Sequence, residues 1–241
     1  MPELSKTMRA ALCGAFCVIV LTAMLVRHAW PLMTGETIYL EVIARDPRDL
    51  FRGDYVVLTY PIDQLTVRPD GAPPAENAGS GVVVKPLGAW WDEVKKEMDG
   101  QDYYYEAGGR WRDKTLYVQL EPQPSQDAGV PQVHRPVTMS DEPIAGSVNL
   151  KGRLRSLYRN YSIDPNMAGD PNQRLTPGDL QLTLHYGIDA LFVQEGTGLQ
   201  IEEAIRAGKV HAVVMVTSSG DARLRDLVID GKTWSSIMAG E

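Results

Sequence analysis

Cysteine is nearly absent from this chain of 241 residues. The only two, Cys13 and Cys17, lie one helical turn apart and close to the N-terminus. The rest of the sequence therefore has neither a disulfide framework nor a thiolate nucleophile, and it can tolerate a compartment that oxidises thiols.

Histidine, a common metal ligand, is also scarce. The sequence holds four histidines, and they stand far apart from one another. Since no cysteine follows Cys17, a transition-metal site would have to be built from residues that are far apart in the sequence. We therefore expect no metal and no cofactor. The four are His28, His134, His185 and His211.

An excess of positive charge is missing as well. The formal net charge is −7 and the isoelectric point is near 5.2, so the chain lacks the basic footprint that holds a nucleic-acid backbone. Without residues 1–28, the remainder carries 21 basic and 30 acidic side chains, a net charge of −9. Such a domain is repelled by an anionic lipid surface. No nucleic-acid partner is expected.

What the sequence does contain is a long apolar run near its start. Residues 10–26 include no charge and no proline. As a helix they would rise about 26 Å, close to the thickness of the hydrocarbon core of a bilayer. Lys6 and Arg9 precede the run, so the positive-inside rule predicts a cytoplasmic segment over 1–9 and a transmembrane anchor over 10–28. A cleaved signal peptide is the alternative, but no small-x-small cleavage site follows the run.

Beyond residue 35 the hydrophobic pattern favours strands. Apolar and polar side chains alternate in several short segments, which predicts one mainly β (α+β) domain over 35–231 and a C-terminal tail over 232–241. The proline-rich stretch 121–146 is predicted to be a loop. The predicted strands cover residues 37–44, 55–60, 115–122, 147–158, 180–187, 190–193, 209–217 and 222–230.

A single helix is predicted in the C-terminal half of the domain. Thr197 and Gln200 have the spacing of a capping box, and Gly208 is typical of the left-handed residue that ends a helix. The apolar side chains between them follow a helical period. We therefore expect the helix to begin after Thr197 and to end at Gly208.

The segment between the first two predicted strands is unusually charged. Residues 45–54, which we call the charged corner, include three arginines and three aspartates. At a tight corner, carboxylates can accept backbone N–H bonds and arginines can bridge neighbouring carboxylates. We interpret the corner as a structural element that sets the register of the two strands. A ligand-binding or hydrolase-like site built from the same side chains is the alternative.

Two motifs in the sequence resemble those of a known family. The charged corner leads into a stretch that spells GDYXXLXY at 53–60, and a second block reads YGIDALFVQEGTGLQIEEAI at 186–205. Together they resemble the family of membrane-anchored proteins named for the first motif, over most of residues 35–231. One departure is Gln194, where the family more often has proline. The family is uncharacterised, so the resemblance implies a membrane-tethered, extracytoplasmic domain, sometimes found with multi-spanning membrane proteins, and no reaction.

The corner and the resemblance single out one set of residues as family motif or binding residues. They are Arg45, Asp46, Asp49, Arg52, Gly53, Asp54, Tyr55, Leu58, Tyr60, Tyr186, Gly187, Glu195, Gly196 and Gly198.

An enzymatic alternative is a distant likeness to signal peptidases. Their catalytic Ser-Met stretch also leads through a proline and an apolar pair to Gly-Asp and a strand. Aligned on Gly53 and Asp54, this chain has Arg45 in the place of the nucleophilic serine. An arginine cannot attack a carbonyl group, so no catalytic residue is predicted. The topology, a membrane anchor followed by a β-rich domain, would remain without the chemistry.

The sequence therefore predicts a non-enzymatic, single-pass protein of the bacterial inner membrane. Its C-terminal domain is expected to be periplasmic and to associate with a partner in the envelope. The expected partner is a multi-spanning membrane protein.

Overall fold

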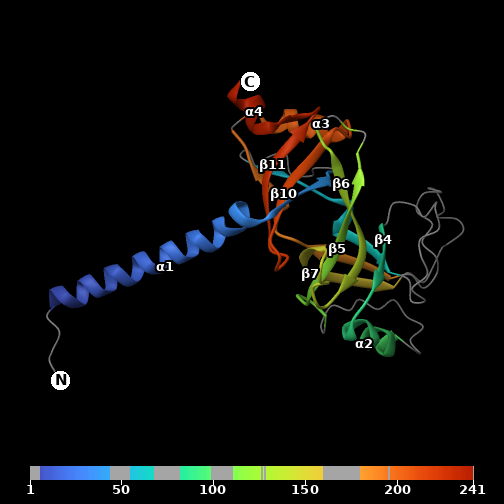
Figure 1. Cartoon of the computed structure of the whole chain (residues 1–241), viewed down its shortest axis with the longest axis horizontal. Helices are drawn as coiled ribbons and strands as arrows, with labels where there is room; N and C mark the ends of the chain where they lie inside the picture. The colour runs from blue at the N-terminus through green and yellow to red at the C-terminus, as the bar shows by residue number, and fades with distance from the viewer. Residues whose placement is uncertain are drawn as a thin grey trace, which may run out of the picture.

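The computed structural model describes residues 6–43, 55–67, 82–98, 111–125, 127, 129–159, 180–194 and 196–240. Strands dominate this part of the chain beyond the N-terminal helix, so the predicted β-rich fold is confirmed. Figure 1 shows the helix as a rod that projects from a globular part. The globular part contains a six-stranded closed barrel, a four-stranded sheet and a two-stranded ribbon.

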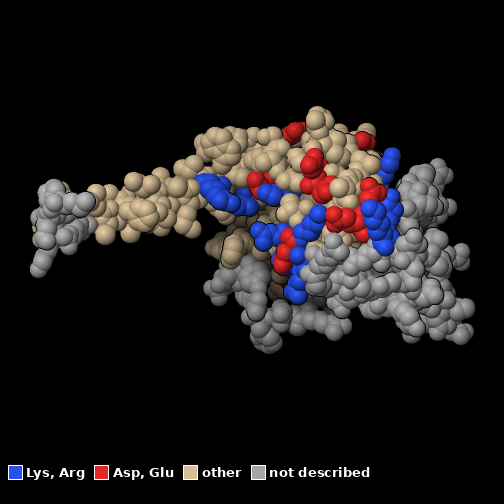
Figure 2. All heavy atoms as spheres, turned by 90° about the horizontal axis from the view of Figure 1, so that it is seen from below, with Lys and Arg blue, Asp and Glu red and all other residues tan. Residues whose placement is uncertain are grey.

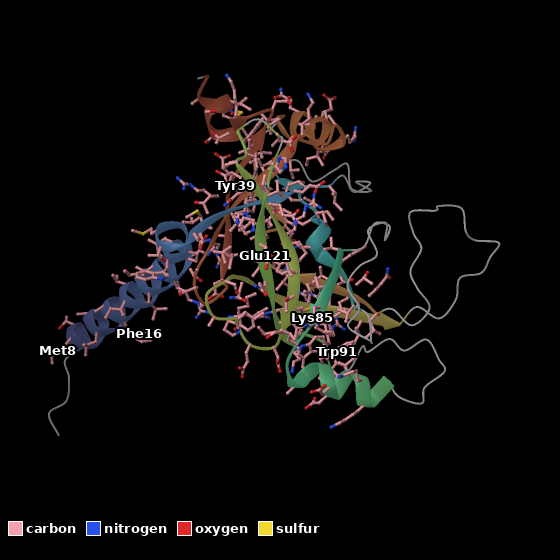
Figure 3. All side chains as sticks on the ribbon, turned by 45° about the vertical axis from the view of Figure 1, so that its right-hand side comes forward. Met8, Phe16, Tyr39, Lys85, Trp91 and Glu121 are labelled. Atoms are coloured by element: carbon pink, nitrogen blue, oxygen red, sulfur yellow. The ribbon has the colours of Figure 1, made fainter. Side chains whose placement is uncertain are left out.

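Helix α1 (Lys6–Thr34) extends beyond the end of the predicted anchor at residue 28. Its stretch Ala11–Thr34 is long and apolar enough to cross a membrane, and its most apolar part is not buried by the rest of the protein. Only the C-terminal end of the helix contacts the globular part, where Pro31 is buried. Figure 3 shows Met8 and Phe16 on the rod, well away from the sheets.

Gly35 joins α1 directly to strand β1 (Glu36–Glu41). The N–H of Gly35 donates to the Pro31 carbonyl at 2.9 Å, and the next residue, Glu36, already pairs with Val216. A Cβ at Gly35 would lie 2.5 Å from the Pro31 oxygen and 2.9 Å from the Val216 nitrogen. The helix and the sheet therefore meet through close backbone contact that requires a glycine.

The four-stranded sheet is antiparallel, with the order β1-β10-β11-β12. Its central strand β10 is buried along its whole length. Helices α3 and α4 pack on one face through Ile201, Ile205 and Trp234. The remaining bounds are β10 (Val210–Val216), β11 (Ala222–Ile229), β12 (Lys232–Thr233), α3 (Gly198–Arg206) and α4 (Trp234–Ala239).

The barrel closes in the order β3-β4-β6-β5-β7-β8. The pairs β3-β4 and β4-β6 are parallel and the others are antiparallel. Alternate apolar side chains of the strands fill the interior of the barrel. Helix α2 packs against the same core through Trp90, Trp91 and Val94. The bounds are β3 (Gln64–Val67), β4 (Val82–Pro86), α2 (Ala89–Met98), β5 (Thr115–Pro124), β6 (Gln132–Ser140), β7 (Val148–Arg159) and β8 (Leu180–His185).

The stretch 121–146 contains the end of β5 and the whole of β6, so the prediction of a loop there was wrong for residues 121–124 and 132–140. Its prolines suggested a loop because proline cannot donate to a sheet ladder. In the structure Pro136 sits at a register shift: Gln119 pairs with Thr138, but Leu120 pairs with Pro136. A β-bulge thus accommodates the proline within the strand.

The ends of the two C-terminal helices differ in part from the sequence-based expectation. Thr197 precedes α3, but its hydroxyl donates to the Gln194 carbonyl at 2.6 Å instead of capping the helix, so the predicted capping box was wrong. The predicted stop is confirmed, because Gly208 is left-handed with φ of 69°. Residues 232–239, expected in a tail, form β12 and α4, which adds a second helix to the C-terminal half.

The long β5–β6 hairpin connects the barrel to the four-stranded sheet (Figure 1). The hairpin covers the face of the four-stranded sheet that is opposite to α3 and α4. Side chains of β10 and β11 reach both faces, because successive residues of a strand point to opposite sides of the sheet. The backbone N–H of Tyr39 in β1 donates to Nδ1 of His134 in β6 at 3.2 Å, and His211 Nε2 lies 3.3 Å from Asp127 Oδ2. Apolar contacts at the same place join Val130, Val133, Val213 and Val228.

Candidate functional site

The two segments that carry the motifs, 55–67 and 180–194, lie side by side as antiparallel neighbours. Strand β2 (Tyr55–Val57) pairs with β9 (Ala190–Phe192), and further along β3 pairs with β8. Between the two pairs, the N–H of Leu58 donates to the Asp189 carbonyl at 2.8 Å. The β2–β9 ribbon is therefore a continuation of one wall of the barrel.

Tyr60, the last residue of the first motif, is buried at the centre of this arrangement. Its hydroxyl donates to the Ile188 carbonyl at 2.7 Å, and its backbone N–H donates to Asp63 Oδ2 at 2.8 Å. Burial raises the pKa of the Tyr60 phenol well above its ordinary value of 10.0, and the charges of Asp63 and Asp189 raise it further. Tyr60 is therefore a neutral hydrogen-bond donor and not an acid–base group at neutral pH.

Tyr186, the first residue of the second motif, makes the reciprocal contact. Its hydroxyl donates to the Ile62 carbonyl at 2.9 Å. Burial, and to a smaller degree the charge of Asp63, raises the pKa of this phenol as well. Gly152 leaves room for the ring, because a Cβ at that position would lie 2.8 Å from Tyr186 Cε1. Tyr186 is thus fixed between the barrel wall and the opposite segment.

The two tyrosines belong to a short repeat, Tyr-x-Ile-Asp, at 60–63 and 186–189. Each tyrosine donates its hydroxyl to the carbonyl of the isoleucine in the other copy. We call this arrangement the tyrosine exchange. The sequence analysis predicted the two tyrosines but missed the isoleucine carbonyls, and the repeat was the signal that could have revealed them. The exchange holds the backbones of both motifs together.

Most of the other motif residues in the described part of the chain have structural roles. Leu58 is 1% exposed and packs in the core. Gly187 and Gly196 adopt φ of 72° and 83°, a left-handed conformation that side chains disfavour. A Cβ at Gly198 would lie 3.6 Å from Val56 Cγ2, an ordinary contact, so the structure gives no steric reason for that glycine. Tyr55 contributes its backbone to β2.

The charged corner lies outside the described residues. The structural and ligand-binding interpretations of it both stay predictions. The predicted site residues that fall there, or elsewhere outside the described part, are Arg45, Asp46, Asp49, Arg52, Gly53, Asp54 and Glu195.

In the described ranges, no group of three or more metal-ligating side chains comes together. The three histidines of the globular part have separate partners. His134 accepts from the Tyr39 N–H, His211 lies 3.3 Å from Asp127, and His185 Nδ1 lies 3.8 Å from Asp189 Oδ1. None of these contacts brings two histidines together.

A small cavity adjoins the tyrosine exchange. Its volume is about 40 Å³, and Tyr60, Ile62, Leu40 and Val133 are among the residues that line it, with His134 at its edge. The walls are mainly apolar. The space is too small for a substrate of ordinary size.

A comparison with protein families matches residues 17–227 to the model described as GDYXXLXY protein. The match covers most of the chain and includes both motif segments and part of α1. No curated protein and no solved structure matches the chain significantly.

Proposed function

The chain belongs to the GDYXXLXY family, and from this membership we propose that it is a membrane-tethered, non-enzymatic interaction protein of the bacterial envelope. Helix α1 is its single membrane anchor, and the β-rich domain lies on the periplasmic side of the inner membrane. The order of charges supports this orientation, since Lys6 and Arg9 precede the apolar run. The confinement of both cysteines to α1 suits an oxidising compartment.

One observation carries the interaction role: the β2–β9 ribbon exposes apolar side chains on its outer face. Val57, Phe192 and the neighbouring Leu199 are exposed to 62%, 80% and 65%. Leu199 lies at the start of α3, a helix that contacts β2. Clustered exposed apolar and aromatic side chains are typical of protein-binding surfaces. We call the set Ile43, Val57, Ala190, Phe192 and Leu199 the ribbon face.

The opposite side of the ribbon is anchored in the core. Val56 is 3% exposed and Leu58 is 1% exposed. The tyrosine exchange fixes the same two segments immediately beside these residues. A surface held in this way loses little conformational freedom when it binds, which favours affinity. The family motif thus serves to present the ribbon face.

The proposed partner is a multi-spanning membrane protein. A chain tethered by α1 meets other proteins of the same membrane at a high effective concentration, so a modest apolar surface suffices for association. The surface of α1 is exposed and apolar over residues 11–26 and can contact a neighbouring span in the bilayer.

Photo-crosslinking in intact cells tests the partner. A photoreactive amino acid at Val57 or Leu199 is expected to capture a specific multi-spanning membrane protein. The matched control is Arg155 on β7, which is exposed but belongs to the barrel wall. Captured products that are the same at Arg155 and at the ribbon face, or that contain no membrane protein, would contradict the proposal.

A pair of substitutions separates binding from folding. Val57→Glu and Leu199→Glu replace exposed side chains, so they are expected to leave the melting temperature within a few degrees of the wild type. They are expected to abolish capture of the partner from a probe placed at Ala190.

Protease treatment of spheroplasts tests the orientation, because a periplasmic domain is digested without lysis.

A further inference from the structure

Basic side chains gather where α1 joins the globular part. Figure 2 shows Lys and Arg atoms in blue at the base of the rod. Three arginines belong to this junction: Arg27 on α1, and Arg223 and Arg225 on β11, a strand that the end of α1 contacts. We call these three residues the basic collar.

Strand β11 places two of the arginines beside the start of β1. Arg223 pairs with Met215 of β10, which in turn pairs with Thr37, two positions after Gly35. Arg225 is the extra residue of a β-bulge, and its Nη1 lies 4.0 Å from Met215 Sδ. Both side chains therefore belong to the end of the sheet that adjoins the helix.

Arg27 is placed by the helix itself. It lies one turn before Pro31, so the two residues are on the same side of α1. Pro31 is buried at the contact with the sheet, whereas Arg27 is exposed. Arg27 thus lies below the sheet contact on the membrane side, and its long side chain can reach toward the lipid headgroups.

The positive charge of the collar is only partly compensated. Within the described ranges, no ion pair of 4.0 Å or less joins these arginines to a carboxylate. Asp221, close by on the same hairpin, contacts Lys151 at 3.3 Å and Ser219 at 2.9 Å, and its charge also offsets part of that of Arg223. Glu36 at the start of β1 offsets part of the charge. The collar stays basic in a chain whose net charge is −7.

Exposed apolar side chains at the end of α1 indicate that the basic collar lies at the level of the lipid headgroups. Trp30, Leu32 and Met33 are exposed to 56%, 39% and 81%. The surface of α1 therefore suits lipid up to its last turn. A headgroup layer about 5–7 Å thick beyond the hydrocarbon would cover the helix end and the adjoining part of the sheet, where Arg223 and Arg225 lie.

We propose that the basic collar binds phosphate groups of anionic phospholipids in the leaflet on the side of the domain. This binding holds the domain at a defined tilt although the rest of it is acidic and is repelled by the same surface. The inference rests on the proposed role of α1 as a membrane anchor.

The test uses the full chain reconstituted in nanodiscs of phosphatidylcholine mixed with phosphatidylglycerol, with retained lipids counted by native mass spectrometry. One arginine near an anionic surface changes binding about fivefold. The wild type is therefore expected to retain phosphatidylglycerol over phosphatidylcholine by a factor of about five or more. The variant Arg223→Gln/Arg225→Gln is expected to lose most of this preference. Because Arg223 is partly buried, Arg27→Gln/Arg225→Gln is a second variant with the same expected loss.

The matched control is Arg155→Gln/Arg206→Gln, which changes the net charge equally at exposed positions on β7 and α3. It is expected to keep the preference of the wild type. Equal retention of both lipids by the wild type, or equal loss in the control and the collar variants, would overturn the inference. If the chain failed to enter nanodiscs at all, the anchor itself would be refuted, so the two proposals fail in different ways.

Discussion

At the scale of single residues, two phenol hydroxyls decide how the family motifs meet. Tyr60 and Tyr186 are both buried, and each donates to a main-chain carbonyl of the other segment. A buried carbonyl that loses its donor is left without a partner, and this costs more than the bond alone contributes. The position of the ribbon relative to the barrel therefore depends on these two hydroxyl groups.

Removing either hydroxyl should weaken the fold measurably. Tyr60→Phe and Tyr186→Phe are each expected to lower the free energy of unfolding by about 1–2 kcal/mol. Because both bonds hold the same pair of segments, the double variant should lose less than the sum. Urea unfolding of the full chain in detergent measures this. Tyr117→Phe is the control, since no hydrogen bond of the Tyr117 hydroxyl occurs among the described residues.

Alkaline pH should reveal the same two groups. Their pKa values are raised by burial, so the unfolded chain releases these protons at lower pH than the folded one. The stabilisation is complete below the ordinary tyrosine pKa of 10.0 and is lost as the pH rises above it. Urea midpoints between pH 8 and pH 11 are expected to fall more steeply for the wild type than for the double phenylalanine variant. Parallel curves would contradict this explanation.

At the scale of elements, the junction between α1 and β1 leaves no space for a side chain. Gly35→Ala brings a Cβ against the Pro31 oxygen and the Val216 nitrogen, both backbone atoms. The expected loss is about 1–3 kcal/mol, as for overpacking elsewhere. Thermal unfolding of the full chain in detergent measures it. Gly14→Ala in the adjoining helix α1 is the control, because a Cβ there meets nothing within 4 Å. Equal melting temperatures for both variants would refute a close-packed junction.

The contact between the β5–β6 hairpin and the four-stranded sheet should depend on pH. Burial lowers the pKa of His134, although the charge of Glu36 opposes this, and its Nδ1 accepts the Tyr39 N–H. The unfolded chain therefore binds a proton more readily than the folded one. The stabilisation is present above the ordinary pKa of 6.5 and is lost as the pH falls below it.

A substitution isolates this effect. His134→Gln keeps an acceptor for the Tyr39 N–H but does not titrate. It is expected to lower the free energy of unfolding by about 1 kcal/mol at pH 8 and to flatten its dependence on pH between 7 and 5. Gln181→Asn, at an exposed position on β8 that does not titrate, is the control and should keep the slope of the wild type. An unchanged slope for His134→Gln would show that other groups cause the acid sensitivity.

At the scale of the whole molecule, the barrel and the four-stranded sheet share one apolar core. A single cluster of buried side chains extends from Ile38 in β1 through the barrel to Trp234 in α4. The ribbon and the β5–β6 hairpin cross between the two parts. Among the described residues, neither part has a separate core of its own, since the smaller cluster of buried valines also joins the hairpin to the sheet.

The globular part is therefore expected to unfold in a single transition. Fluorine NMR of fluorotryptophan-labelled protein can follow Trp90 and Trp91 at the barrel end and Trp234 at the sheet end. All three native signals should disappear at the same urea concentration, together with the circular dichroism of the strands. Separate midpoints for Trp234 and the barrel tryptophans would show that the parts are independent.

Local features of the fold could be predicted from the sequence. The apolar run of α1, the alternation in β1 and β8, the nearly continuous apolar run of β10 and the left-handed stop at Gly208 depend on neighbours in the chain. Strand β6 was missed because the prolines that punctuate it are local signals for a loop, whereas its place in the barrel depends on β4 and β5.

The sequence by itself thus determined the class of the fold, the presence of a membrane-suited helix near the N-terminus and the identity of the motif residues. Only the tertiary structure decided that Tyr60 and Ile188, which are 128 positions apart, share a hydrogen bond, and that the same exchange recurs with Tyr186 and Ile62. The physical reason is that hydrophobic period and turn chemistry act over a few residues, whereas strand pairing and barrel closure depend on which distant surfaces can be buried together.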